Sequence, residues 1–269
     1  MIATGKQTAF TMIELVLVIV LLGILSISFA KILSQSVSGY IDAKGRNEHS
    51  QTAKWVTEVI SRSAREALPQ SIRTGVSGNL DCVEYLEIVN ASSYFNLPAN
   101  GPVSSFNIVS YDLVFQSGLS AAIMPINAPS VYIGNNVVSP IASIASSGPQ
   151  QSLITLVAPT VFAQRSPQNR LYILSSPITF CLNNATGLIS RYSNYGFSAS
   201  LAFPPSTGTS EIIGENFWAN GNVFNYQSGS LQRSGLLQIN FVMQDRNRFP
   251  SGTSESFEVF HEVHIRNVP

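Results

Sequence analysis

The sequence predicts an α+β protein in which a long N-terminal helix packs on an antiparallel β-rich domain. Three observations lead to this prediction. Phe10 opens an apolar run of 21 residues that ends at Ala30. Apolar residues then recur at helical spacing as far as Leu68. After Pro69 the chain consists of short apolar runs separated by Gly, Pro, Asn and Ser, as expected for strands joined by turns.

The apolar run is long enough to cross a membrane. Its 21 residues would extend about 31 Å as a helix, at 1.5 Å per residue, and a bilayer core is about 30 Å thick. It contains one charged residue, Glu14. An ionised group within a membrane segment costs roughly 2.5–3.5 kcal/mol on insertion scales, so such a group usually has a function and a partner.

We expect the helix to continue beyond the membrane segment, because Lys31 to Leu68 contains no proline. Arg62 and Arg65 fall near its end, where the helix dipole favours cations. Pro69 ends it by excluding helical backbone from the preceding residue. Any bend is expected at Gly39 or Gly45, since glycine weakens a helix. One apolar stripe is predicted to pack under the β domain: Val56, Val59, Ile60, Ser63, Ala64, Ala67 and Leu68.

Eight segments of the remaining chain have the composition of β-strands. They are residues 82–89, 110–116, 130–134, 152–158, 170–183, 187–193, 235–245 and 256–268. The four residues Asn184 to Gly187 separate two of them and predict a hairpin turn. Residues 135–151, rich in Ser, Pro and Asn, are expected to form a loop. The aromatic stretch 217–227 receives no assignment.

Composition argues against a nucleic-acid partner. Lys and Arg number 15, Asp and Glu number 15, and together they make up 11% of the chain, so the formal net charge is zero. Typical domains are near 25% charged. No run of basic residues is present, and a basic patch is the usual mark of a nucleic-acid-binding surface.

The two cysteines, Cys82 and Cys181, suit no CxxC redox or zinc motif. If the β domain lies outside the cytoplasm, a disulfide between them is expected. The alternative is two buried free thiols.

The sequence contains no recognisable catalytic or metal-binding motif: GxSxG, the P-loop and HExxH are all absent. On a strand, His261 and His264 would point to opposite faces and form a poor metal pair. Several carboxylates are expected to be solvated at strand ends and in loops: Glu84, Glu87, Asp112, Asp245 and Glu255. We therefore expect a non-enzymatic protein without a cofactor.

The order Ala9, Phe10, Thr11, Met12, Ile13, Glu14 resembles the processing site of type IV prepilins. That resemblance implies a pilin-like fold, cleavage between Ala9 and Phe10 by a prepilin peptidase, and N-methylation of Phe10 by the same enzyme. It also implies that Glu14 pairs with the N-terminal amine of a neighbouring subunit during assembly. Ala9 stands where the family most often has Gly. The implied organisation is a leader at 1–9, a transmembrane half-helix at 10–30, a helical stem at 31–68 and a β-rich domain at 69–269.

Two shorter motifs, AREALPQSIR (64–73) and FHEVHIRNVP (260–269), resemble minor pilins of the MshO type from the mannose-sensitive haemagglutinin (MSHA) pilus system. The resemblance extends more widely to PilW-type minor pilins and the type II secretion pseudopilin J. The resemblance implies a structural subunit that helps to start or cap a type IV pilus together with other minor and major pilins. Its location would be the inner membrane, with one span and a periplasmic C-terminal domain, and then the pilus after processing.

Two other interpretations of the N-terminus remain open. The helix could be a plain signal anchor for a periplasmic binding module that never enters a filament. It could also be an ordinary secretory signal peptide cleaved after Ser28-Phe29-Ala30, although an apolar region of about 20 residues exceeds the usual 7–15.

Overall fold

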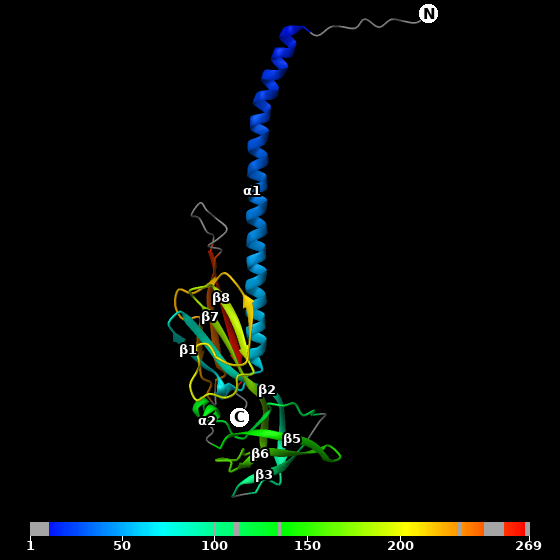
Figure 1. Ribbon diagram of the computed structural model, residues 1–269, viewed down its shortest axis with the longest axis vertical. Helices are drawn as coiled ribbons and strands as arrows, with labels where there is room; N and C mark the ends of the chain where they lie inside the picture. The colour runs from blue at the N-terminus through cyan, green and yellow to red at the C-terminus, as the bar shows by residue number, and fades with distance from the viewer. Residues whose placement is uncertain are drawn as a thin grey trace, which may run out of the picture. The chain divides into compact units, whose positions relative to one another are not determined.

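The computed structural model describes residues 11–98, 101–109, 113–133, 136–230, 233–244 and 256–266 (Figure 1). The chain divides into two units, Met1–Gln51 and Thr52–Pro269. The first unit is helical wherever it is described from Met12 onward. The second combines the end of the same helix with the β domain.

Helix α1 (Met12–Arg65) spans 54 residues without interruption and passes through both Gly39 and Gly45. It begins where the Thr11 carbonyl accepts hydrogen bonds from the backbone N–H groups of Glu14 and Leu15. Its continuity follows from the absence of proline, which would remove a helical hydrogen bond. The predicted long helix is therefore confirmed over its described residues; the predicted first residue, Phe10, lies outside them.

The helix ends three residues earlier than predicted, at Arg65 rather than Leu68. Leu68 has extended backbone, with φ −66° and ψ 115°, as expected of a residue before proline. Its N–H donates to the Leu86 carbonyl over 2.8 Å, and Glu66 accepts from the Ile88 N–H. The chain thus begins to pair with a strand before Pro69, where the short 3₁₀ helix η1 (Pro69–Ser71) starts.

Nine strands form the larger sheet, in the order β1-β2-β3-β6-β5-β4-β7-β8-β9, with an additional pairing between β2 and β7. The strands are β1 (Arg73–Ser77), β2 (Leu80–Phe95), β3 (Val103–Val109), β4 (Ser120–Ala122), β5 (Val138–Gly148), β6 (Gln151–Thr160), β7 (Arg170–Asn183), β8 (Leu188–Ser193) and β9 (Thr209–Gly214). Each pairing is antiparallel.

The β2–β7 pairing closes six of these strands into a ring: β2, β3, β6, β5, β4 and back through β7. This small barrel encloses its own apolar core, which includes Phe106, Ile108, Ile154, Leu171 and Ile173. The ladder between β2 and β7 shifts register twice, between Leu86 and Ile88 and between Ile88 and Asn90. Such irregularities bend strands, and here they occur where two long strands pass from the open sheet into the barrel. Figure 1 shows β3, β5 and β6 grouped apart from β1 and β8.

A second sheet packs on the open part of the first. It consists of β10 (Phe217–Trp218), β11 (Phe224–Gln227), β12 (Gly235–Gln244) and β13 (Ser256–Ile265), with β12 between β13 and the two short strands. One core joins this sheet, the open part of the larger sheet and the end of α1, and it includes Val56, Ile60, Phe180, Phe217 and Phe241. A side chain at Gly214 would meet Phe217 at 2.5 Å and Val56 at 2.8 Å, so glycine permits this close contact between β9 and the helix.

The predicted stripe of α1 is confirmed. Val56, Ile60, Ala64, Ala67 and Leu68 are at most 3% exposed; Val59 and Ser63 lie at its margin and are half-buried. Burying each large apolar side chain contributes roughly 1.5–3 kcal/mol, so this stripe fixes the last turns of the helix on the β domain.

Most strand predictions are confirmed, and three local predictions are wrong. Residues 113–116 of the predicted strand 110–116 are not in a strand; residues 110–112 lie outside the described part. Residues 130–134 were predicted as a strand, but Ala128–Tyr132 is the short helix α2, with Asn127 as N-cap. The Asn127 side chain accepts from the Ser130 N–H, and Pro129 lies in the first turn, so local capping outweighs the β-branched composition.

The predicted loop 135–151 contains the eleven-residue strand β5. Ser and Pro in this segment suggested a loop, yet Ser139 and Ile141 are buried and pair into the barrel. The ladder between β5 and β6 shifts between Ile141 and Ser143, directly after Pro140, which has no N–H to donate. The unassigned stretch 217–227 forms β10 and β11. The hairpin at Asn184–Gly187 is confirmed, with Gly187 at φ +73°.

Candidate functional site

The first described turns of α1 carry apolar side chains on every face. All residues from 11 to 41 are exposed. The large apolar residues among them are Met12, Ile13, Leu15, Val16, Leu17, Val18, Ile19, Val20, Leu21, Leu22, Ile24, Leu25, Ile27, Phe29, Ile32, Leu33, Val37, Tyr40 and Ile41. A surface helix of a soluble protein is apolar on one stripe only. A helix that is apolar all round belongs in lipid or in the core of an assembly.

This helix is long and apolar enough to span a membrane, and it is the one such helix among the described residues. Three of its serine side chains are satisfied within the helix. The hydroxyls of Ser26, Ser28 and Ser38 donate to the carbonyls of Leu22, Ile24 and Ser34, at 2.6, 3.3 and 2.9 Å. Internal hydrogen bonding of this kind is what a segment in lipid requires.

Glu14 differs from these serines. It lies in the first turn of α1, is exposed, and within the described residues its carboxylate has no hydrogen bond or ion pair. The positive end of the helix dipole favours an acidic residue there, but this is worth only about 0.3–1 kcal/mol at an exposed position. That is less than the cost of burying the charge in lipid, roughly 2.5–3.5 kcal/mol. The helix dipole alone therefore does not offset the cost of an ionised carboxylate at this position once the helix is surrounded by apolar material.

Of the other predicted site residues, the structure describes the two cysteines but not the two residues of the processing site. Ala9 and Phe10, at the predicted processing site, lie outside the described residues. Cys82 and Cys181 form the predicted disulfide. They are directly opposed on β2 and β7 and are separated by 99 residues of chain. The bond thus joins the two strands that carry the barrel, just before they enter it.

One predicted carboxylate position is wrong. Glu84 was expected to be solvated, but it lies inside β2 with its side chain 1% exposed. It forms an ion pair with Arg73 and accepts a hydrogen bond from the Tyr195 hydroxyl over 2.8 Å. Arg73 also donates to the carbonyls of Ser198 and Ala199 at 2.9 Å, and its guanidinium lies 3.7 Å from the centre of the Tyr132 ring.

This buried cluster holds parts of the β domain together. Burial and the nearby Glu84 charge raise the pKa of Tyr195, and burial raises the pKa of Tyr132 well above its ordinary value. Both phenols therefore remain neutral. The hydrogen bonds of Glu84 and Arg73 go to the protein itself and tie residues 195–199 to β1 and β2. Glu87, also expected to be solvated, is half-buried and accepts from the Ser63 hydroxyl.

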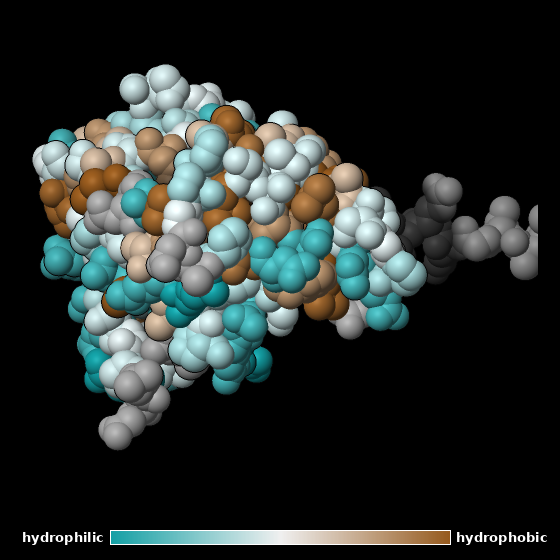
Figure 2. Space-filling model, turned by 90° about the horizontal axis from the view of Figure 1, so that it is seen from below, coloured by the Kyte–Doolittle hydropathy of each residue, from teal (hydrophilic) through white to brown (hydrophobic). Residues whose placement is uncertain are grey.

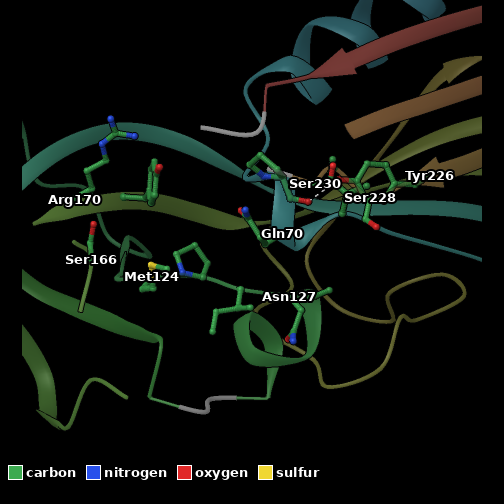
Figure 3. A pocket seen from close by; sticks show the side chains of 15 residues that line it. Gln70, Met124, Asn127, Ser166, Arg170, Tyr226, Ser228 and Ser230 are labelled. Atoms are coloured by element: carbon green, nitrogen blue, oxygen red, sulfur yellow. Dashed lines mark hydrogen bonds between the residues drawn. The ribbon is translucent and has the colours of Figure 1, made fainter. Parts of the chain in front are cut away.

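A cavity of about 580 Å³ lies where η1, the segment before α2, the barrel and the end of β11 meet (Figure 3). Its wall includes Gln70, Met124, Asn127 and Tyr226, and the Tyr226 hydroxyl donates to the Pro69 carbonyl over 2.9 Å. Figure 3 shows the guanidinium of Arg170 pointing away from Ser166 and Met124. The cavity has the volume of a small-molecule site, and Arg170 is the one charged residue in its described lining.

No group of three or more His, Cys, Asp and Glu side chains suited to a metal ion occurs within the described ranges. On β13, His261 is half-buried and His264 is exposed. This difference agrees with the prediction that the two side chains point to opposite faces of the strand. On the face shown in Figure 2, apolar and hydrophilic residues are interspersed. The long continuous series of exposed apolar residues is on α1.

Comparison with known proteins gives no relative: no family model, no curated protein and no solved structure matches this chain. The architecture itself is a long apolar N-terminal helix on an antiparallel β domain with an internal disulfide. This arrangement fits a pilin-like fold.

Proposed function

We propose that this protein is a minor pilin, a non-enzymatic subunit that helps to start or cap a type IV pilus of the MSHA kind, most similar to MshO. The single observation that supports this best is the helix that begins at Met12. It is apolar on every face, carries one carboxylate in its first turn, and continues without a break into a folded β domain. A membrane anchor alone would need the apolar length but not the carboxylate.

The same segment serves in two environments. Before assembly it spans the inner membrane, with the β domain in the periplasm. After the prepilin peptidase removes residues 1–9 and methylates Phe10, the helix leaves the lipid and packs against the apolar helices of other minor and major pilins. Apart from those at the helix ends, the backbone groups remain satisfied within the helix in both environments, so the transfer exchanges one apolar contact for another.

Glu14 directs this transfer. Its carboxylate has no partner among the described residues, and the amine of a neighbouring Phe10 would supply the opposite charge. Because the pair forms only when the two helices are in axial register, it favours one position of the incoming subunit. The disulfide between Cys82 and Cys181 supports a domain outside the cytoplasm, since such bonds persist in oxidising compartments.

N-terminal sequencing of the mature protein from membranes tests this proposal. A pilin should begin at Phe10. A chain that keeps Met1 is a plain anchor, and a chain that begins at Lys31 has lost a conventional signal peptide. Either of the last two results would overturn the proposal.

A second candidate function is a membrane-anchored periplasmic binding module, and the cavity of about 580 Å³ favours it. The location of the protein in the cell distinguishes the two functions. Immunogold labelling of sheared pili should detect a pilin in the fibre fraction, whereas a binding module remains wholly with the membrane.

A further inference from the structure

A groove runs along the last turns of α1, beside the buried stripe. We call it the stem groove. On the helix side it is lined by a series of residues spaced by three and four positions, which places them on one face. They are Trp55, Glu58, Val59, Arg62, Ser63 and Glu66. The groove lies within the second unit and has a volume of about 460 Å³.

The opposite wall is a row of side chains across the larger sheet. Phe180 on β7 is paired with Arg191 on β8, and Arg191 with Glu211 on β9. Glu87 and Ile213 complete this wall. The row ends at β9, which pairs with β8 and has no other strand neighbour among the described residues.

The apolar side chains of this wall form the floor of the groove, where Phe180 is fully buried and Ile213 is 9% exposed. At one end Trp55 leaves 55% of its surface exposed, although it stands beside this floor. Tryptophan is enriched at protein interfaces, where its large ring fills a gap between two chains. An exposed indole next to an apolar floor is the kind of surface that protein interfaces cover.

The rim of the groove is acidic. Arg62 lies 3.5 Å from Glu58, and Arg191 lies 3.6 Å from Glu211, so both cations already have an acidic partner. The other two carboxylates, Glu66 and Glu87, have no cationic partner within the described residues; Glu87 accepts only the Ser63 hydroxyl. The rim thus keeps two negative charges for an incoming cation.

The dimensions suit an extended chain. Trp55 and Glu66 are eleven residues apart, or about 16 Å along a helix. A strand rises about 3.3 Å per residue, so five residues of extended chain match this length.

We propose that the stem groove binds an extended segment of another protein in which apolar and basic side chains alternate. The apolar side chains would cover the floor, the basic ones would face Glu66 and Glu87, and a cation near Trp55 would gain from its aromatic face. The proposal rests on the groove alone and does not depend on whether the chain enters a pilus.

The test uses the full-length protein in phosphatidylcholine nanodiscs and two synthetic peptides, Val-Lys-Val-Arg-Val and Val-Glu-Val-Glu-Val, both blocked at the ends. Isothermal titration should detect binding of the basic peptide and none of the acidic one. The isosteric double variant Glu66→Gln/Glu87→Gln should weaken binding about threefold to tenfold, as expected for two partly exposed ion pairs. Added salt should remove most of that difference.

The matched control is Glu215→Gln/Glu258→Gln, which removes two exposed carboxylates outside the groove and should leave binding unchanged. Circular dichroism confirms that both double variants are folded. Equal binding of the two peptides, binding of neither, or an equal effect of the control would overturn the proposal. Self-association in sedimentation experiments that is lost in Glu66→Gln/Glu87→Gln would also overturn it, because the occupant would then be a second copy of this chain.

Discussion

The backbone N–H of Val223 donates to the carboxylate of Asp81 over 2.6 Å, and this hydrogen bond joins the two sheets of the β domain. Asp81 lies on β2 of the larger sheet, and Val223 directly precedes β11 of the second. The other carboxylate oxygen of Asp81 is buried without a partner in the described part of the chain. Burial raises the pKa of Asp81 to about 6, although the backbone N–H groups of Val223 and Phe224 oppose the shift.

The first prediction concerns the effect of pH on stability. Because the pKa of Asp81 is raised in the folded state, from 3.8 to about 6, the folded protein holds this proton more tightly than the unfolded chain. The contribution of Asp81 to the free energy of unfolding should therefore be full below pH 3.8 and should fall as pH rises to about 6. Asp81→Asn should lack this fall. Urea denaturation of both proteins from pH 3.5 to 7 measures the difference, and parallel curves would contradict the assignment.

The second prediction concerns the buried ion pair of Arg73 and Glu84. Arg73→Leu leaves the Glu84 carboxylate in the interior without its cation, and breaking a buried pair this way typically costs about 3–5 kcal/mol. The double variant Arg73→Leu/Glu84→Leu removes both charges and should lose less. Arg191→Leu is the control, since its pair with Glu211 is more exposed and should contribute about 1 kcal/mol or less. Equal losses for Arg73→Leu and Arg191→Leu in urea denaturation would show that burial of the pair is unimportant.

The third prediction concerns the disulfide, which closes a loop that contains almost the whole barrel. Replacing both Cys82 and Cys181 with Ala should lower the free energy of unfolding by roughly 2–5 kcal/mol. Amide hydrogen exchange should rise most in β2 and β7, because the bond joins these strands directly. An equal increase in hydrogen exchange in the second sheet, whose strands do not pair with β2 or β7, would argue instead for general destabilisation.

The elements with a regular pattern could be predicted from the sequence. The apolar run from Met12 specifies a helix by its length, and the stripe that includes Val56 and Ile60 does so by its spacing. The limits of β7 were also correct, because Arg170 to Asn183 is a long and mostly apolar run between turn residues. In each case the signal lies within a few neighbouring residues.

The barrel and the buried ion pair could not be predicted, because they depend on contacts between distant residues. Closure of the barrel requires β2 to pair with β7, about 90 residues later, while four other strands complete the ring. Glu84 is buried because Tyr195, 111 residues away, and Arg73 satisfy its oxygens. A carboxylate in an alternating strand is usually solvated, and nothing beside Glu84 in the sequence indicates otherwise. By contrast, the cap Asn127 with Pro129 and Ser130 was a local signal for α2 that the β-branched composition obscured.

The fourth prediction concerns processing. Ala9 is small and precedes Phe10, and Glu14 follows in the register of a prepilin site. Ala9→Leu should block access of the prepilin peptidase and leave a precursor longer by nine residues, still held in the membrane by the apolar helix. Mass spectrometry of the membrane fraction measures both lengths. Ala9→Gly is the control and should be processed normally. If Ala9→Leu matures to the same length as the wild type, the proposed site is wrong.

The fifth prediction separates assembly from anchoring and depends on Glu14. Glu14→Val lengthens the apolar run, so the variant should insert into the membrane and be cleaved before Phe10 like the wild type. It should then fail to support normal numbers of pili, because the carboxylate is the charged group available to hold a neighbouring amine in register. Glu14→Asp retains the charge on a shorter side chain and should restore part of the function.

The decisive comparison uses a strain that lacks this protein, complemented with the wild type, Glu14→Val or Glu14→Asp at matched expression. Surface pili are counted by electron microscopy, and crosslinking to other minor pilins is measured in the same cells. Both should fall together for Glu14→Val, since a subunit out of register makes neither contact. A full complement of pili with Glu14→Val would mean that the charge is dispensable and that the β domain alone brings this subunit into the complex. The stem groove would then be the first surface to test, because its carboxylates Glu66 and Glu87 lie on that domain and are unaffected by the change.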